Sequence, residues 1–449
     1  MKSKLIILTA ALIFFTGIEQ LSAQRPKIEF QQFDLQNGLH VILHRDNSSP
    51  VIAINVMYHV GSKNEQPDRT GFAHFFEHLM FEGSKYIGRG EYDKYIQNAG
   101  GKSNAFTSFD ITDYYDILPS NQLDLGLWLE SERMLHLKVD SIGVETQRKV
   151  VKEERKMRYE NQPYGSFLQE LFSTAYKVYP YRWVPIGEVQ YIDQAKLSEF
   201  MNFYHEFYVP QNAVLVIAGD INIDSTKAVI EKYFSGIPKG KEKIYRPQEV
   251  EPPQTKEITK TIYDNIQLPG LFMGYHMPSM GTKDYYALEM LQTLLSGGKS
   301  SRLYKELVDK QQKAVQIAAV PLGLEAPGLF IVYSLANAGV NLDSLKNSID
   351  VEIDKVKKNL IDEHEFEKLR NQVEDNFVNG NSTFEGIAEN LADYYTVLHD
   401  PNLINTLLDK YYDVTREDIR RVANTYLTKE NRTVLYYLPK SQQPDSSNK

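Results

Sequence analysis

The chain has 449 residues, a net charge of -9 and no cysteine. This length exceeds one ordinary hydrophobic core and predicts two large domains or four small ones. The acidic balance excludes non-specific binding to nucleic acid, because phosphate repels a negative surface, and the lack of cysteine excludes disulfides and thiolate metal ligands.

The first residues have the pattern of a secretory signal peptide. Lys2 and Lys4 precede an apolar stretch at residues 5–18, and a small-residue cleavage site ends at Ala23. The apolar stretch is shorter than the roughly 20 residues of a membrane span, so an uncleaved anchor is the less favoured alternative. We predict a signal peptide at residues 1–23, export to the periplasm or secretion, and no membrane span in the mature chain.

Over about the next 200 residues, the hydrophobic periodicity predicts alternating strands and helices. A hairpin is predicted at 33–43, with its turn at Asn37-Gly38. Residues 70–81 have helical character, with Thr70 as the N-cap and Gly83 as the stop. The remaining predicted elements are strands at 51–60, 103–118 and 213–218, and helices at 123–137, 144–160 and 197–208.

Composition changes at residues 236–258, which are rich in proline and charge and predict a linker. The two sides of this linker resemble each other, since residues 207–214 and 425–434 both join a long helix to an apolar strand. We therefore predict an α+β fold of two similar domains, with a metal site in the first domain and none in the second. The predicted bounds are 24–235 for the first domain, 259–440 for the second and 441–449 for a disordered tail.

A match between residues 285–298 and residues 71–84 locates the difference between the domains. The first segment of the chain has His74, Glu77 and His78. The later segment carries Leu288, Leu291 and Gln292 at those positions. The expected metal site therefore belongs to the first domain alone.

The run His74-Phe75-Phe76-Glu77-His78 is the strongest chemical signal in the chain. Residues four apart on a helix lie nearly above one another, so both imidazoles can reach one ion about 2 Å from each nitrogen. Glu77 shares that face and can take a proton from activated water. The order H-x-x-E-H inverts the commoner zinc motif. We expect one zinc per chain, with His74 and His78 as ligands and Glu77 as general base.

The motif alone leaves two questions, namely whether this helix binds a metal and which residue is the third ligand. An ordinary helix is the plain alternative, but the apolar continuation at residues 79–81 predicts burial, and a buried charged cluster needs a partner such as a metal. Catalytic zinc also needs a third protein ligand beside an open position. Glu153 and Glu154 on the predicted helix 144–160 both offer a carboxylate for that role.

Further motifs extend over nearly all of the mature chain: Gly71-x-x-His74, Phe81-x-Gly83-Ser84, Gly100–Tyr114, Val150–Glu154, Tyr208–Asp220 and Ser300–Leu303. With the zinc motif, they resemble the pitrilysin/insulinase family of metallopeptidases, and most closely its two-domain branch, which includes mitochondrial processing peptidase. The resemblance implies that Glu154 is the third zinc ligand, with Glu153 as a neighbour that supports it.

The resemblance also implies how substrate binds. Residues 103–107 correspond to an edge strand to which the substrate backbone adds as a further strand. Asn104, Ala105 and Thr107 are therefore candidate substrate contacts. A plain structural strand is the alternative.

Two features depart from the family. The chain has Gln147 where relatives often carry a second glutamate. Active relatives also use an arginine and a tyrosine to hold the substrate carbonyl over the zinc, and the alignment from Ser301-Arg302-Leu303 places Val308 and Val315 at these positions. Valine cannot donate a hydrogen bond, so the polarising half of the active site is missing from this chain.

The resemblance implies a zinc-dependent endopeptidase that hydrolyses peptides or unfolded segments, and the predicted signal peptide implies that it is exported. The missing arginine and tyrosine favour a heteromeric complex in which a related subunit carries that pair, and a homodimer is the other assembly. The alternative function is a non-catalytic binding or assembly subunit, which the two valines favour and the intact zinc motif opposes. A zinc hydrolase acting on another class of substrate is a third interpretation.

Overall fold

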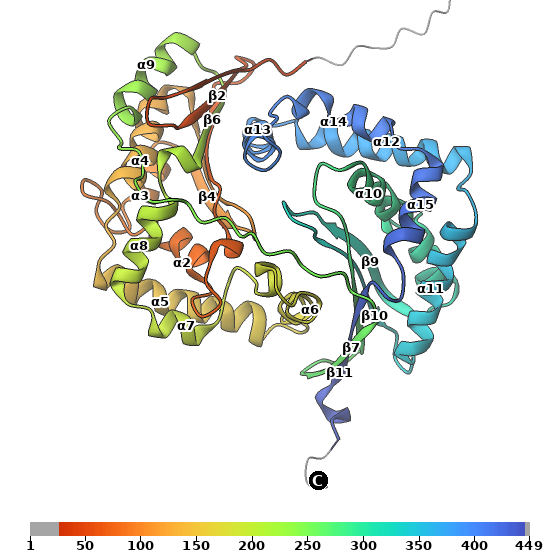
Figure 1. Ribbon diagram of the computed structural model, residues 1–449. Coiled ribbons are helices and arrows are strands. Elements are labelled where there is room, and N and C mark those ends of the chain that lie inside the picture. The colour runs from red at the N-terminus through yellow and green to blue at the C-terminus, as the bar shows by residue number, and fades with distance from the viewer. Residues whose placement is uncertain (1–26, 445–449) are drawn as a thin grey trace, which may run out of the picture.

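The computed structural model describes residues 27–444, which form two halves that face each other (Figure 1). The predicted signal peptide and residues 445–449 of the predicted tail lie outside the described residues. The start of that tail contributes to a short 3-10 turn, η7 (Lys440–Gln442). Within residues 27–444, no helix combines the length and the apolar character needed to cross a membrane.

The N-terminal half is built on a six-stranded sheet in the order β1-β2-β6-β3-β5-β4. Its strands are β1 (Gln31–Asp34), β2 (His40–Arg45), β3 (Val51–Tyr58), β4 (Lys102–Thr107), β5 (Thr112–Pro119) and β6 (Ala213–Gly219). Its longer helices are α2 (Phe72–Leu79), α3 (Tyr92–Asn98), α4 (Leu123–His136), α5 (Ser141–Arg155), α6 (Phe167–Ala175), α7 (Val189–Gln194), α8 (Leu197–Phe207) and α9 (Ile223–Phe234).

The C-terminal half is built on a five-stranded sheet in the order β7-β11-β8-β10-β9. Its strands are β7 (Ile258–Asp264), β8 (Gly270–His276), β9 (Ala314–Leu322), β10 (Leu329–Ala336) and β11 (Arg432–Pro439). Its helices are α10 (Lys283–Ser296), α11 (Leu342–Lys358), α12 (Glu363–Gly380), α13 (Phe384–Leu398), α14 (Leu403–Tyr412) and α15 (Arg416–Tyr426).

Both sheets share one topology. In the N-terminal half, β2 pairs in parallel with β6, and β3, β5 and β4 follow in antiparallel order. In the C-terminal half, β7 pairs in parallel with β11, and β8, β10 and β9 follow in antiparallel order. Apart from β1, which has no counterpart in the second sheet, the two arrangements are the same strand by strand in chain order, and α10 follows β8 as α2 follows β3. The prediction of two similar α+β domains is confirmed, and β4 and β9 are equivalent edge strands.

Each half covers the inner face of the other half's sheet with one helix. Helix α13 packs on β3 and β6, and α6 packs on β8 and β11 (Figure 1). The first contact unites Ile42, Ala53, Met57, Val214, Val216 and Ala218 with Ile387, Ala388, Leu391 and Ala392. The second unites Phe167, Leu171 and Phe172 with Phe272, Ile331, Leu435 and Tyr437. Because each fully buried large apolar side chain contributes about 1.5–3 kcal/mol, these two helices hold the halves together.

The local structure agrees with the predicted hairpin and differs at the predicted strand 103–118. Asp34 pairs with His40, and the turn residue Gly38 has the positive φ of 89° that favours glycine. The predicted strand is instead a hairpin of β4 and β5. Ser108 closes its turn, because its amide donates to the carbonyl of Ile111 at 2.8 Å and its hydroxyl accepts the amide hydrogens of Asp110 and Ile111.

Candidate metal centre

The helix that carries the predicted zinc motif begins at a buried carboxylate. Glu65 accepts the amide hydrogens of Gly71 and Ala73, at 2.9 and 2.8 Å, and so satisfies the free N–H groups at the start of α2. Burial raises the pKa of Glu65, and these amide hydrogen bonds oppose that rise. The prediction that Thr70 is the N-cap is wrong, because its hydroxyl accepts the amide hydrogen of Glu188 instead.

The opposite face of α2 is fixed by aromatic packing. The rings of Phe72 and Phe75 stack on Phe200 of α8, with centroids 4.7 and 4.6 Å away. Phe76 stacks on Phe203 of the same helix. These contacts orient α2, because the rings at positions 72, 75 and 76 share one face and the motif residues occupy the other.

The three predicted zinc ligands lie together where α2 packs against α5. Oε2 of Glu154 lies 3.1 Å from Nε2 of His78 and 3.5 Å from Nε2 of His74. A tetrahedral ion with bonds of about 2.0 Å requires ligand atoms about 3.3 Å apart. The two separations from Glu154 bracket that value, and all three ligand atoms lie within 4.8 Å of one another, so one ion can reach all three.

The protonation of this group also suits a cation. Burial, helped by the neighbouring His78, lowers the pKa of His74 to about 4, so this imidazole is neutral at pH 7 and has a free lone pair. Burial alone would raise the pKa of Glu154, but the hydrogen bond with His78 and the nearby basic groups bring it below its ordinary value. A carboxylate and neutral imidazoles are the donor set that zinc prefers when thiolates are absent.

The predicted general base lies beside the ligands and is held by a hydroxyl group. Thr107, the last residue of β4, donates a hydrogen bond from Oγ1 to Oε2 of Glu77 at 2.6 Å. Burial raises the pKa of Glu77, and the bond from Thr107 partly opposes this rise. The sequence placed Thr107 among substrate contacts, and the structure shows that its side chain orients the base.

Of the two neighbouring glutamates on α5, Glu154 faces the histidines. The side chain of Glu153 is 69% exposed and lies 4.0 Å from Lys156, whereas Glu154 is 15% exposed. Arg158 adds a contact that the zinc motif does not predict, since its Nη1 lies 3.1 Å from Oε1 of Glu154. The spacing of four residues on a helix is the signal that could have identified this pair.

The strand expected to receive substrate lies at the free edge of the sheet. Within residues 27–444, β4 pairs with β5 alone, so its outer N–H and C=O groups have no strand partner. Asn104 donates to the hydroxyl of Tyr115 at 3.3 Å, and Ala105 packs against the main core. A second chain could extend the sheet at this edge by strand addition.

Three residues at which the sequence departs from the family pattern lie in other surroundings: Gln147, Val308 and Val315. Gln147 donates a hydrogen bond from its amide to Glu82 at 2.6 Å. Val308 packs against the core of the C-terminal half, and Val315 on β9 is 45% exposed. Arg302 donates to both carboxylate oxygens of Glu365, at 3.0 and 2.6 Å, which occupies its guanidinium.

The chain is similar to known peptidases in sequence and in fold. Residues 40–183 match the model of the insulinase family, peptidase family M16, and residues 195–373 match the model of the M16 inactive domain. A zinc protease of Helicobacter pylori, PqqE, is 34% identical over 441 residues, which cover 97% of this chain and 98% of that protein.

Solved structures agree with these matches. The crystal structure of a protease from Helicobacter pylori has a TM-score of 0.88 and 32% identity, covering 92% of this chain and 100% of that one. A putative M16-like peptidase from Alicyclobacillus acidocaldarius has a TM-score of 0.79 at 22% identity, covering 92% of this chain and 98% of that one. The second likeness shows the shared fold alone.

Proposed function

We propose that the chain, which belongs to the insulinase family of peptidases, family M16, is an exported zinc-dependent endopeptidase. Its proposed substrates are peptides or unfolded segments. One observation carries the proposal. The ligand atoms of His74, His78 and Glu154 lie within 4.8 Å of one another. Glu77 on the same helix is hydrogen-bonded to Thr107, the last residue of the free edge strand. A candidate metal site, a base and a place for substrate backbone thus meet at one point.

The chemistry follows from the positions of the chain's own groups. His74, His78 and Glu154 would hold the zinc, which would supply Lewis-acid chemistry at this point. Glu77 takes the proton from the attacking water and delivers it to the leaving amine. Its raised pKa makes it a stronger base than an exposed glutamate, and Thr107 fixes the direction of its carboxylate. Because the lowered pKa keeps His74 neutral at pH 7, its imidazole lone pair is available for a metal.

Strand addition at β4 favours unfolded substrates. A segment that pairs with β4 must be extended and must have free backbone N–H and C=O groups. Asn104 and Ala105 lie in the middle of that strand and would contact such a segment through their backbone. A folded protein offers few segments of this kind, so peptides and unfolded chains are the substrate class.

The proposal is tested with the mature chain, stripped of metal and reloaded with zinc, on a set of unstructured peptides. We expect cleavage that depends on zinc and is lost in Glu77→Gln. Equal cleavage by the variant, or by the metal-free chain, would refute the mechanism. Zinc binding without cleavage in any assembly would instead favour the alternative, a non-catalytic binding or assembly subunit.

The proposal includes a partner. Val308 and Val315 replace the pair that holds the substrate carbonyl in active relatives, so a homodimer would lack two hydrogen-bond donors near the reacting oxygen. Losing one such donor costs about 3 kcal/mol of transition-state stabilisation. A related subunit that carries the arginine and tyrosine would supply both donors in a heteromeric complex.

The missing donors can be tested within this chain. The double variant Val308→Arg/Val315→Tyr should raise peptide turnover by about a hundredfold or more if the donors limit the rate. Val320→Tyr is the matched control, because Val320 is exposed on the same strand. No gain in the double variant, in a chain that binds zinc normally, would contradict the need for such a partner.

A further inference from the structure

Two equivalent loops, one from each half, meet beside the candidate active site. The loop at residues 108–111 joins β4 to β5. The loop at residues 323–328 joins β9 to β10. β4 and β9 are the equivalent edge strands of the two sheets, so a contact between these loops links the ends of both edges.

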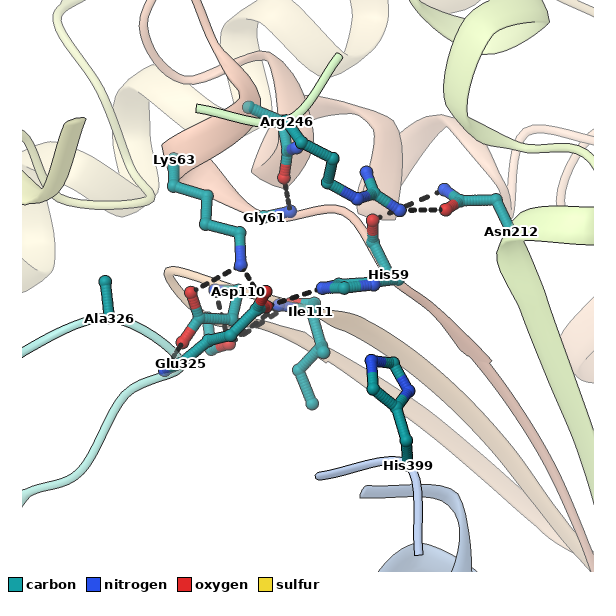
Figure 2. Close-up of polar contacts among 12 residues, drawn as sticks. His59, Gly61, Lys63, Asp110, Ile111, Asn212, Arg246, Glu325, Ala326 and His399 are labelled. Carbon is teal, nitrogen blue, oxygen red and sulfur yellow. Dashed lines mark hydrogen bonds and ion pairs between the residues drawn. The ribbon is translucent and has the colours of Figure 1, made fainter. Parts of the chain in front are cut away.

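A buried lysine joins the two loops (Figure 2). Nζ of Lys63 lies 2.9 Å from Oδ1 of Asp110 in the first loop and forms a closer ion pair with Glu325 in the second. The amide of Glu325 also donates to Oδ2 of Asp110 at 3.0 Å. The side chains of Lys63 and Asp110 are only 2% and 6% exposed. A charge this deeply buried is costly unless it is paired, so the second loop helps to satisfy charges of the first half.

Neighbouring groups complete the cluster. Nε2 of His59 lies 2.6 Å from the Glu325 carboxylate. The hydroxyl of Tyr181 donates to Asp110 at 2.6 Å and accepts the amide hydrogen of Ala326 at 3.1 Å. Burial would raise the pKa of Glu325, but the bonds from His59 and Lys63 hold that pKa at about 2. The carboxylate is therefore charged throughout the physiological range.

The cluster is connected to the catalytic machinery through the backbone. The amides of Ser62 and Lys63 donate to the carbonyls of Ser108 and Phe109, at 3.2 and 3.0 Å. The turn that these bonds hold begins directly after Thr107, whose hydroxyl orients Glu77. A shift of this turn would move the end of β4, where substrate is proposed to lie.

We propose that Lys63, Asp110 and Glu325 form an interdomain clamp that fixes the spacing of the two edge strands and thereby positions β4 for substrate. These are positioning residues, which act through the arrangement of the halves and not on reacting atoms. The effect of the clamp on catalysis rests on the proposed function, whereas its effect on the arrangement of the halves does not.

Distances between spin labels test the clamp without reference to activity. The chain has no cysteine, so Lys94→Cys on α3 and Lys358→Cys at the end of α11 give one labelled site in each half. Both side chains are exposed. We expect Glu325→Gln to add a second population at longer distance between the labels, as measured by pulsed electron–electron double resonance.

The matched control is Glu170→Gln. Glu170 on α6 also pairs with a lysine of the other half, Lys260, whose side chain is 45% exposed. The lysine that pairs with Glu325, Lys63, is only 2% exposed. Removing the charge of Glu170 should leave the distribution unchanged, because exposed ion pairs contribute little. A distribution in Glu325→Gln that is the same as in the control would overturn the clamp, whether or not the chain proves to be a peptidase.

Kinetics then separate positioning from a general loss of stability. When only a fraction of molecules has the competent arrangement, apparent affinity falls by that fraction. If Glu325→Gln leaves about a fifth of molecules clamped, KM should rise about fivefold while kcat at saturating peptide stays the same. A fall in kcat at unchanged KM would show a loss of folded enzyme and would contradict the positioning role.

Discussion

The neighbouring glutamates of α5 provide a matched pair of substitutions for the metal site. Glu154→Ala removes the oxygen that lies 3.1 and 3.5 Å from the two imidazole nitrogens. Glu153→Ala removes a carboxylate of the same size, one residue away, that is 69% exposed. Both changes place alanine, a good helix former, in the same helix, so their difference reports the metal site and not helix stability.

The magnitude follows from the number of ligands. With Glu154 absent, zinc keeps two protein ligands, which is one fewer than catalytic zinc sites use. Removing even an outer-shell partner of a zinc ligand costs about 10–100-fold in affinity, so loss of the ligand itself should cost at least about a hundredfold, or about 3 kcal/mol. Glu153→Ala should change zinc affinity by less than about threefold, as expected for an exposed group.

Zinc affinity is measured by competition with a chromogenic chelator, and bound zinc by elemental analysis after dialysis. We expect about one zinc per chain in the unmodified protein and in Glu153→Ala, and loss of zinc in Glu154→Ala, as in His74→Ala and His78→Ala. Retention of zinc by Glu154→Ala together with its loss from Glu153→Ala would refute the assignment of the third ligand.

Four further predictions concern the base, the clamp and the mature chain. Glu77→Gln should keep zinc while turnover falls at least about a hundredfold, and near-normal turnover would remove Glu77 from the mechanism. Thr107→Val should lower turnover about tenfold with zinc content unchanged, because the base loses its orienting bond. The pKa of Glu325 lies at about 2, below its ordinary value of 4.5, so its contribution to stability is present above pH 4.5 and disappears as pH falls toward 2. The difference in urea midpoint between wild type and Glu325→Gln should therefore shrink between about pH 6 and pH 3, and a constant difference would contradict this origin. N-terminal sequencing of the exported protein should give a start near Gln24, whereas a cytoplasmic form starting at Met1 would refute export.

Local spacing accounts for the parts of the site that the sequence predicts. His74, Glu77 and His78 lie within five consecutive residues, so helical periodicity alone places them on one face. Glu154 is 76 residues beyond His78, and only the family resemblance selected it over Glu153. The geometry gives the physical reason for that choice, since Glu154 points toward α2 and Glu153 points toward solvent.

The features that the sequence did not predict depend on tertiary contacts. The pairing of Lys63 with Glu325 joins residues 262 positions apart, and no local pattern encodes it. Thr70 has the right chemistry for an N-cap, but the more distant Glu65 occupies the start of α2. The single strand predicted at 103–118 ignored the turn signal of Ser108 and Asp110, because the flanking residues have continuous β propensity.

The central claim is tested most directly by single-turnover cleavage of an unfolded polypeptide, with the mature chain in excess and products identified by mass spectrometry. The reaction is run with metal-free chain, zinc-reloaded chain and zinc-reloaded Glu77→Gln. We expect internal cleavage by the reloaded chain, slow without a partner, and none by the other two. Equal amounts of product in all three reactions would contradict a zinc peptidase centred on His74, His78 and Glu154. So would the absence of product in every reaction, including one with the double variant Val308→Arg/Val315→Tyr.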